Sequence, residues 1–284
     1  MRRFSFSLLP LLLAGCSPLT AFNGVVPKDA GGVLLAKDQA YGAHPRQRLD
    51  IYAPRKLAAG AQVPVIVWFY GGSWNSGSRQ GYAFAGRALA SRGFVVAVPD
   101  YRLVPEVRYP AFLEDGAAAV KWIRANVARH GGDPDRLVLA GHSAGAYNAA
   151  MLALDPRWLG ADRAAVKGLI GLAGPYDFLP LDVASTQNAF GHVADFPSTQ
   201  PVSHAGAGDP PALLVAGADD TLVRPRQTAA LAQRLKAAGV SAETRLYPGV
   251  GHIGVMTALA RPLRGKAPVL QDAADFATRV TAGR

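Results

Sequence analysis

The pentapeptide Gly141-His142-Ser143-Ala144-Gly145 lies between two segments whose patterns predict a strand and a helix. Residues 136–140 form an almost continuous apolar run, as in a strand buried on both faces. Residues 144–154 are rich in alanine and leucine, which favour a helix. Glycine on either side of the serine permits a sharp strand-to-helix turn that presents Ser143 beside backbone N–H groups at the helix N-terminus. This pattern predicts an α/β fold with Ser143 as a candidate nucleophile.

The rest of the chain repeats the alternation of strand and helix. Between the apolar runs lie helix-like segments, and this order predicts a mostly parallel central sheet with helices on both faces. An irregular stretch at residues 176–211, rich in Gly, Pro and Asp, predicts a short lid-like insertion. The further strands are expected at residues 63–70, 94–98, 168–173, 212–216 and 243–247, and the further helices at 112–129, 225–238 and 272–280.

Composition favours one large globular domain, expected over residues 31–284. Half of the 284 residues are hydrophobic and 18% are charged, which excludes a disordered chain. The net charge is +10, but Lys and Arg are scattered without a run of like charges, so no nucleic-acid partner is expected. The six histidines lack the spacing of metal ligands, and no metal or organic cofactor is expected.

The first residues predict export. Met1-Arg2-Arg3 is followed by an apolar stretch at residues 8–13 and then by Leu13-Ala14-Gly15-Cys16, the layout of a secretory signal over residues 1–15. The segment resembles a bacterial lipoprotein signal, which implies lipidation of Cys16, the one cysteine in the chain. The alternative is an ordinary export signal. Cleavage would remove Arg2 and Arg3 and lower the net charge from +10 to +8.

A lipid at Cys16 implies a protein attached to a bacterial membrane by acyl chains. Residues 16–30 are then expected to be a tether between lipid and domain. The absence of Asp after the cysteine resembles outer-membrane sorting, so the expected location is the periplasmic face of the outer membrane.

A base and an acid for Ser143 are expected at the same edge of the sheet, where loops follow the parallel strands. His252 follows the last predicted strand in a glycine-rich loop, whereas His142 adjoins the serine on a tight turn and must point away from it. The acid should lie between nucleophile and base in sequence. Asp220, after the strand at residues 212–216, is preferred, and Asp219 is the alternative, since it could instead shape the turn.

Further segments resemble the α/β-hydrolase superfamily, in the esterase and lipase branch related to hormone-sensitive lipase, bacterial carboxylesterases and arylformamidases. They are residues 49–54, the Asp-Tyr-Arg-Leu-Val-Pro-Glu segment at 100–106, and residues 220–223. The resemblance covers about residues 46–256 and implies oxyanion donors at Gly72, Ser73 and Ala144. The branch usually has His-Gly-Gly where this chain has Tyr70-Gly71-Gly72, so the Tyr70 hydroxyl is an alternative brace for the loop. Arg102 is expected to pair with Glu114 or Asp115.

These residues predict a serine carboxylic-ester hydrolase that works through an acyl-enzyme on a small-molecule ester or amide. Two alternatives remain open: an arylformamidase that uses the same residues, and a catalytically inactive lipid-anchored binding protein. Aromatic side chains are candidates for an apolar substrate pocket, with burial in the core as the alternative. They are Trp74, Tyr147 and Phe178, followed by Phe190 and Phe196.

Overall fold

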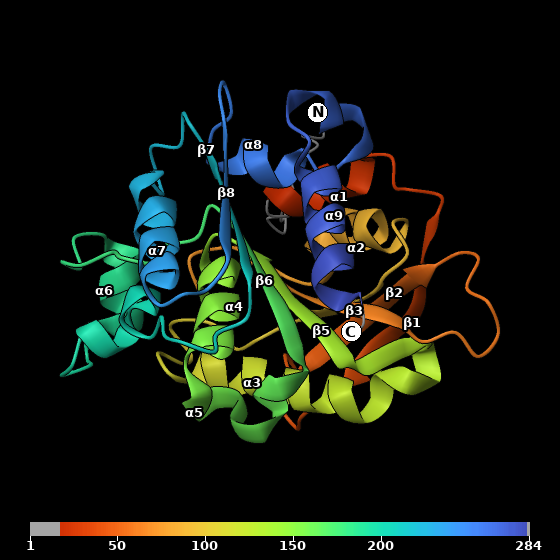
Figure 1. Cartoon of the computed structure of the whole chain (residues 1–284), viewed down its shortest axis with the longest axis horizontal. Coiled ribbons are helices and arrows are strands. Elements are labelled where there is room, and N and C mark those ends of the chain that lie inside the picture. The colour runs from red at the N-terminus through yellow and green to blue at the C-terminus, as the bar shows by residue number, and fades with distance from the viewer. Residues whose placement is uncertain (1–17, 283–284) are drawn as a thin grey trace, which may run out of the picture.

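The computed structural model describes residues 18–282 (Figure 1). The expected signal peptide and Cys16 lie outside the described residues. Eight strands form one sheet in the order β1-β2-β4-β3-β5-β6-β7-β8. Their bounds are β1 (Gly32–Ala40), β2 (Arg48–Pro54), β3 (Val63–Phe69), β4 (Val95–Pro99), β5 (Gly132–His142), β6 (Val166–Leu172), β7 (Ala212–Gly217) and β8 (Ala242–Tyr247).

The sheet is mostly parallel, as the alternation of elements predicted. Strand β2 runs antiparallel to both of its neighbours, β1 and β4, and every other adjacent pair is parallel. The strands from β3 to β8 therefore end at one edge of the sheet, so that the loops following them gather side chains from distant parts of the sequence there.

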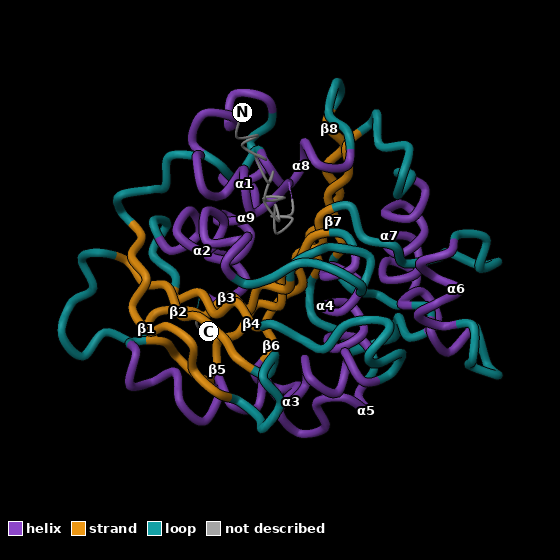
Figure 2. The backbone as a smooth tube through the Cα atoms, turned by 180° about the vertical axis from the view of Figure 1, so that it is seen from behind, coloured by secondary structure: helices purple, strands orange, loops and turns teal. Residues whose placement is uncertain are grey.

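Helices cover both faces of the sheet (Figures 1 and 2). Helices α2 and α9 pack on one face, and α3 and α4 pack on the other. This arrangement confirms the predicted α/β-hydrolase fold. The helices are α1 (Pro18–Val25), α2 (Ala83–Ala90), α3 (Ala111–Asn126), α4 (Ala144–Leu154), α5 (Pro156–Leu159), α6 (Ala184–Phe190), α7 (Arg226–Ala237), α8 (His252–Thr257) and α9 (Val269–Thr281).

The core is deepest around β3, β5 and α4. Every residue of α4 is buried, which explains why this helix is apolar on all sides rather than on one stripe. Strand β5 ends at His142 and α4 begins at Ala144, so Ser143 alone joins the buried carboxyl end of β5 to a fully buried helix. A rigid core thus fixes the position of the candidate nucleophile.

Several elements differ from the sequence expectations. Strand β1 was not predicted: it lies at the sheet edge, most of its side chains are at least partly exposed, and its apolar stretch is limited to residues 33–36. Helices α2, α5 and α8 were not predicted either. Within the expected tether, residues 18–25 form helix α1, which packs against the segment before α2. The lid-like stretch contains helix α6 and two short 3-10 turns. Within residues 18–282, no helix is long and apolar enough to span a bilayer.

Candidate active site

The turn at Ser143 is held in a backbone conformation that few residues adopt. Ser143 has φ 54° and ψ −125°, a left-handed value of φ that is strained for a residue with a side chain. A Cβ atom on Gly141 would lie 2.4 Å from the Gly145 carbonyl carbon, and one on Gly145 would lie 2.1 Å from the Phe69 carbonyl oxygen. Both glycines are therefore required for α4 to approach the sheet at this angle.

Ser143, His252 and Asp220 meet at the carboxyl edge of the sheet. The Nε2 atom of His252 lies 2.9 Å from Ser143 Oγ, and its Nδ1 atom lies 2.8 Å from Asp220 Oδ2. Asp220 follows β7, and His252 follows β8 as the first residue of α8 rather than as part of a loop. The three residues, predicted from their places after three different strands, thus form one continuous hydrogen-bonded chain.

Asp220 is the carboxylate in contact with the histidine, whereas Asp219 is exposed to solvent. The other oxygen of Asp220 accepts hydrogen bonds from the backbone N–H groups of Leu222 and Val223, at 2.9 and 2.8 Å. Burial alone would raise the pKa of Asp220, but the hydrogen bonds from His252 and from these N–H groups outweigh it and hold the pKa below its ordinary value. The carboxylate is therefore ionised and fixed in orientation.

His142 forms a second contact with the histidine segment, which the sequence analysis did not anticipate. Its side chain is 2% exposed, and its Nε2 atom lies 3.2 Å from the carbonyl oxygen of His252. Its Nδ1 atom lies 3.3 Å from the hydroxyl of Tyr82, which also accepts the Gly71 N–H at 3.0 Å. Burial, and then the nearby His252 ring, lower the pKa of His142 to about 3, so the ring is neutral.

This hydrogen-bond pattern defines the tautomer of His142. A neutral ring has one donor nitrogen, and a carbonyl can only accept, so Nε2 carries the proton and Nδ1 accepts from Tyr82. The chain of contacts joins the loop after β3, at Gly71, to the backbone of His252. The signal in the sequence was a histidine immediately before the serine, but its partners lie far away in the chain.

The loop after β3 turns its backbone toward Ser143. Gly72, Ser73 and Trp74 have φ values of 131°, 50° and 58°, three successive left-handed residues. Gly72 and Ser73 line a cavity that reaches Ser143, and Ser73 and Ala144 line a second one. Among the described residues, the N–H groups of Gly72, Ser73 and Ala144 have no hydrogen-bond partner. The three residues predicted as oxyanion donors therefore line the cavities that reach Ser143, where donors to a ligand oxygen would be required.

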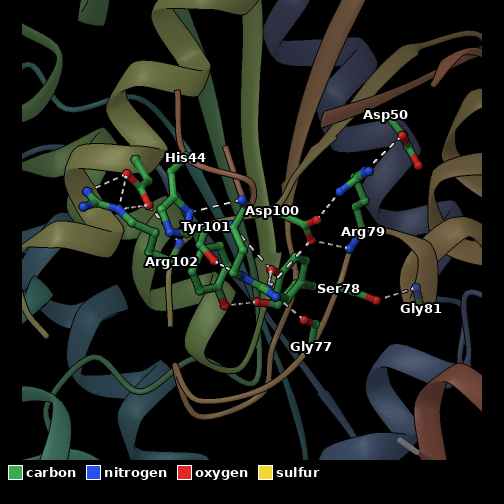
Figure 3. Close-up of polar contacts among 12 residues, drawn as sticks. His44, Asp50, Gly77, Ser78, Arg79, Gly81, Asp100, Tyr101 and Arg102 are labelled. Carbon is green, nitrogen blue, oxygen red and sulfur yellow. Dashed lines mark hydrogen bonds and ion pairs between the residues drawn. The ribbon is translucent and has the colours of Figure 1, made fainter. Parts of the chain in front are cut away.

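Tyr70, which stands where the related enzymes usually have histidine, is held by an arginine. The Nη2 atom of Arg46 donates to the Tyr70 hydroxyl at 2.7 Å and to the Gly77 carbonyl at 3.0 Å, while its Nε atom donates to the Tyr101 carbonyl at 2.8 Å (Figure 3). The rings of Tyr70 and Tyr101 stack with centroids 4.7 Å apart. Arg46 thereby links Tyr70 and Gly77, near the two ends of the loop, to the backbone of Tyr101, whose ring stacks on Tyr70.

A buried ion cluster holds the far end of the same loop. Arg79 donates to Asp50 from Nε at 3.1 Å and pairs with Asp100 through a second nitrogen (Figure 3). Its third nitrogen pairs with Asp38. The backbone N–H of Arg79 also donates to Asp100, at 2.7 Å. Arg79, Asp50 and Asp100 are 7%, 2% and 4% exposed. This cluster fixes the point at which the loop rejoins the core.

Comparison with known proteins places the chain in a family. The family model described as BD-FAE matches residues 49–235, which is more than half of the 284 residues and includes Ser143 and Asp220. The chain belongs to the BD-FAE family.

Curated relatives of this BD-FAE protein are larger. It is 33% identical over 236 residues to "Esterase LipC" of Mycobacterium tuberculosis, with 75% of this chain and 58% of the relative covered. It is 29% identical over 248 residues to "Probable isoprenylcysteine alpha-carbonyl methylesterase ICME" of Oryza sativa subsp. japonica, with 79% and 59% covered. The chain thus spans less than two thirds of the length of these two relatives.

Solved structures share the fold of this BD-FAE protein. A truncated carbohydrate esterase from gut microbiota superposes with a TM-score of 0.79 at 22% identity, covering 91% of this chain and all of that one. The carboxylesterase EstE1, cloned from a metagenomic library, gives a TM-score of 0.77 at 23% identity, with 93% and 94% covered. At such identities the likeness concerns the fold.

The aromatic residues proposed for a pocket in this BD-FAE protein divide into three groups. Trp74 and Phe178 line a cavity of about 440 Å³ that reaches Ser143. Tyr147 and Phe190 are fully buried and pack edge-on against Trp74, with ring centroids 5.2 and 4.9 Å away, so they support the cavity wall from behind. Phe196 is 36% exposed and lies outside this cavity.

Arg102 of this BD-FAE protein has the structural role expected for it. Its guanidinium donates to both oxygens of Asp115 at 2.8 to 3.0 Å, and Glu114 lies 3.8 Å away. Asp115 is 1% exposed and also accepts from Gln47. This pair joins the segment after β4 to α3.

Residues 18–282 contain no group of three or more His, Cys, Asp or Glu side chains arranged to hold a metal ion.

Proposed function

We propose that the protein is a serine carboxylic-ester hydrolase that acts through Ser143, His252 and Asp220. The observation that carries the proposal is the hydrogen-bonded chain from Ser143 Oγ to His252, at 2.9 Å, and from His252 to Asp220, at 2.8 Å. Esterase names among the relatives and membership of the BD-FAE family support an ester as the substrate.

In the first half of the reaction, His252 Nε2 removes the proton of Ser143 while Oγ attacks the ester carbonyl carbon. The carbonyl π electrons move to oxygen, and the N–H groups of Gly72, Ser73 and Ala144 bind the resulting oxyanion. Asp220 stabilises the imidazolium through Nδ1. The C–O bond to the alcohol then breaks, and His252 gives its proton to the leaving alkoxide oxygen.

In the second half, water takes the place of the alcohol. His252 removes a proton from the water, whose oxygen attacks the acyl carbon and forms a second oxyanion in the same site. The bond to Ser143 Oγ breaks, and His252 returns the proton to the serine. The acid is released, and the enzyme is restored without net gain or loss of protons in its own side chains.

Hydrolysis of p-nitrophenyl acetate by the full chain, compared with Ser143→Ala, tests the proposal. We expect turnover that falls by about 10⁴-fold or more in the variant, together with labelling of the wild type by a fluorophosphonate and no labelling of the variant. A folded wild-type protein with neither hydrolysis nor labelling would favour a binding protein and overturn the proposal. An aryl formamide in the same assay measures the amide activity directly.

For location, we infer that the protein is exported and anchored by lipid at Cys16 on the periplasmic face of the outer membrane. The support is the basic, then apolar, then small-residue order of residues 1–16. Expression in a Gram-negative host with labelled palmitate should give a labelled protein in the outer-membrane fraction. Cys16→Ser should abolish both label and membrane retention, and label that persists in this variant would contradict the inference.

A further inference from the structure

Two cavities of different chemical character meet at Ser143. One has a volume of about 440 Å³ and the other of about 400 Å³, and both are lined by Ser73, Ser143 and Leu222. A tetrahedral carbon bonded to Ser143 has two remaining substituents besides its oxyanion, the acyl chain and the alcohol. The two cavities are therefore positioned to hold one substituent each, an assignment that rests on the proposed ester hydrolysis.

His252 distinguishes the two cavities. In the proposed reaction its Nε2 atom gives a proton to the leaving oxygen, so the alcohol must lie on the histidine side of Ser143. His252 lines the 400 Å³ cavity and does not line the 440 Å³ cavity. The 400 Å³ cavity is therefore the alcohol side, and we name it the alcohol cavity.

The alcohol cavity has an apolar wall. Leu19, Phe22, Ile253 and Met256 contribute side chains to it, and none of its lining residues is Asp, Glu, Lys or Arg. The opposite cavity, by contrast, is lined by Asp182, Arg224 and Arg226. A charged alcohol in the alcohol cavity would lose hydration without gaining a partner. The side that receives the leaving group therefore favours uncharged hydrocarbon.

Part of this wall comes from the N-terminal helix. Leu19 and Phe22 lie on α1, and Asn23 of the same helix donates to the Gln80 carbonyl at 2.8 Å and accepts from the Phe84 N–H at 3.0 Å. The Phe22 ring also packs edge-on against Phe84, with centroids 5.3 Å apart. Asn23, Gln80 and Phe84 do not line the cavity, so these contacts hold α1 in place without requiring that the cavity be filled.

We propose that the enzyme selects esters of uncharged alkyl or aryl alcohols, and that α1 supplies the wall that recognises the alcohol. Leu19 is the residue that reports this role best, because it lines the alcohol cavity whereas the hydrogen bonds and ring contact that dock α1 come from Asn23 and Phe22. Its substitution should alter selectivity among alcohols without altering the hydrogen-bonded chain at Ser143.

The test varies the alcohol and the acid separately, with the full chain. For the acetate esters of methanol, butanol and hexanol, kcat/KM should rise by about fourfold for each methylene that the cavity buries. Acetylcholine, the acetate ester of a charged alcohol, should be a poor substrate. Leu19→Ser should lower the hexyl-to-methyl ratio of kcat/KM by roughly tenfold, because the hexyl group loses more buried contact than the methyl group. Methyl esters of longer acids should show no such effect of Leu19→Ser.

Val25→Ser is the matched control, since Val25 lies on the same helix, is 83% exposed and is absent from the cavity wall. It should behave as wild type, and the thermal unfolding of both variants should match, which separates selectivity from loss of α1 packing. Equal kcat/KM for methyl and hexyl acetate, or a change in acid selectivity rather than alcohol selectivity in Leu19→Ser, would overturn this inference and leave ester hydrolysis standing. Failure of the wild type to hydrolyse any ester would overturn both.

Discussion

The ring of His142 donates from Nε2 to the main-chain carbonyl of His252, 3.2 Å away, while the side chain of His252 reaches Ser143 on its other side. Two histidines therefore lie beside Ser143: the side chain of His252 contacts the serine, and the side chain of His142 contacts the backbone of His252. The ring centroids lie 4.8 Å apart. His252 is held through its backbone by His142 and through its side chain by Asp220, so its Nε2 atom is fixed from two directions.

Replacing His142 should slow catalysis more than it weakens substrate binding. His142→Leu removes the donor to the His252 carbonyl, and we expect kcat to fall roughly 10- to 100-fold with KM within about threefold, because a small displacement of a general base is costly. His142→Gln, which retains an N–H donor, should recover part of the loss. Steady-state kinetics with p-nitrophenyl acetate measures the split, and equal kcat values for wild type and His142→Leu would contradict a positioning role.

His142 should also make the folded protein sensitive to acid. Its pKa is about 3 in the fold against 6.5 ordinarily, so between these values the unfolded chain binds a proton that the folded chain does not. The free energy of unfolding therefore has its full value above about pH 6.5. It falls as the pH drops below this value, by about 1.4 kcal/mol per pH unit. Urea unfolding between pH 4 and 7 should show a slope in the wild type that exceeds the slope in His142→Gln by about one proton. Identical slopes would show that His142 is already charged in the fold.

The two adjacent aspartates provide a matched comparison. Asp220→Asn keeps the shape of the side chain but removes the charge that stabilises the His252 imidazolium, and kcat should fall by about 10⁴-fold. Asp219→Asn changes an exposed neighbour that makes no contact with the histidine, and activity should stay within about twofold. Steady-state measurement of kcat for both variants decides which aspartate is the acid. A larger loss of kcat in Asp219→Asn than in Asp220→Asn would reverse the assignment.

Arg79 should be important for stability. Arg79→Leu leaves the buried carboxylate of Asp50 without its cation and that of Asp100 with Arg46, 4.0 Å away, and we expect the free energy of unfolding to fall by about 3–5 kcal/mol. Arg279→Leu, which breaks an ion pair with Glu243 on the surface, should change it little. Chemical denaturation followed by tryptophan fluorescence measures both. A change in Arg79→Leu no larger than in Arg279→Leu would mean that the cluster is already well solvated.

The meeting of Ser143, Asp220 and His252 was predictable because it depends on local pattern and parallel topology. Each residue follows a strand of the parallel part of the sheet, and the ends of parallel strands share an edge. Strand β1 was not predicted in this way, since it is a partly exposed edge strand in which only four consecutive residues, 33–36, are apolar. Residues 18–25 form a helix that packs against residues 80–82, a tertiary contact that the composition of the segment does not predict.

Contacts between side chains distant in sequence were the part that the sequence could not supply. Tyr70 suggested a hydroxyl brace, but nothing in the chain identified Arg46, 24 residues earlier, as its partner. Tyr82 and His142, 60 residues apart, likewise meet only because β3 and β5 are neighbours in the sheet. Such pairs follow from the packing of whole elements and leave no periodic trace along the chain.

The docking of α1 bears on how the enzyme would meet its substrate. Leu19, in the wall of the alcohol cavity, is three residues from Cys16, a separation of at most about 11 Å of extended chain. With lipid on Cys16, as we infer, the cavity could not drift far from the bilayer surface. Esters dissolved in the lipid would then be found by lateral diffusion in two dimensions. An ester dilute in the aqueous phase but concentrated in the bilayer would be hydrolysed much faster by the anchored protein than by the same chain released into solution.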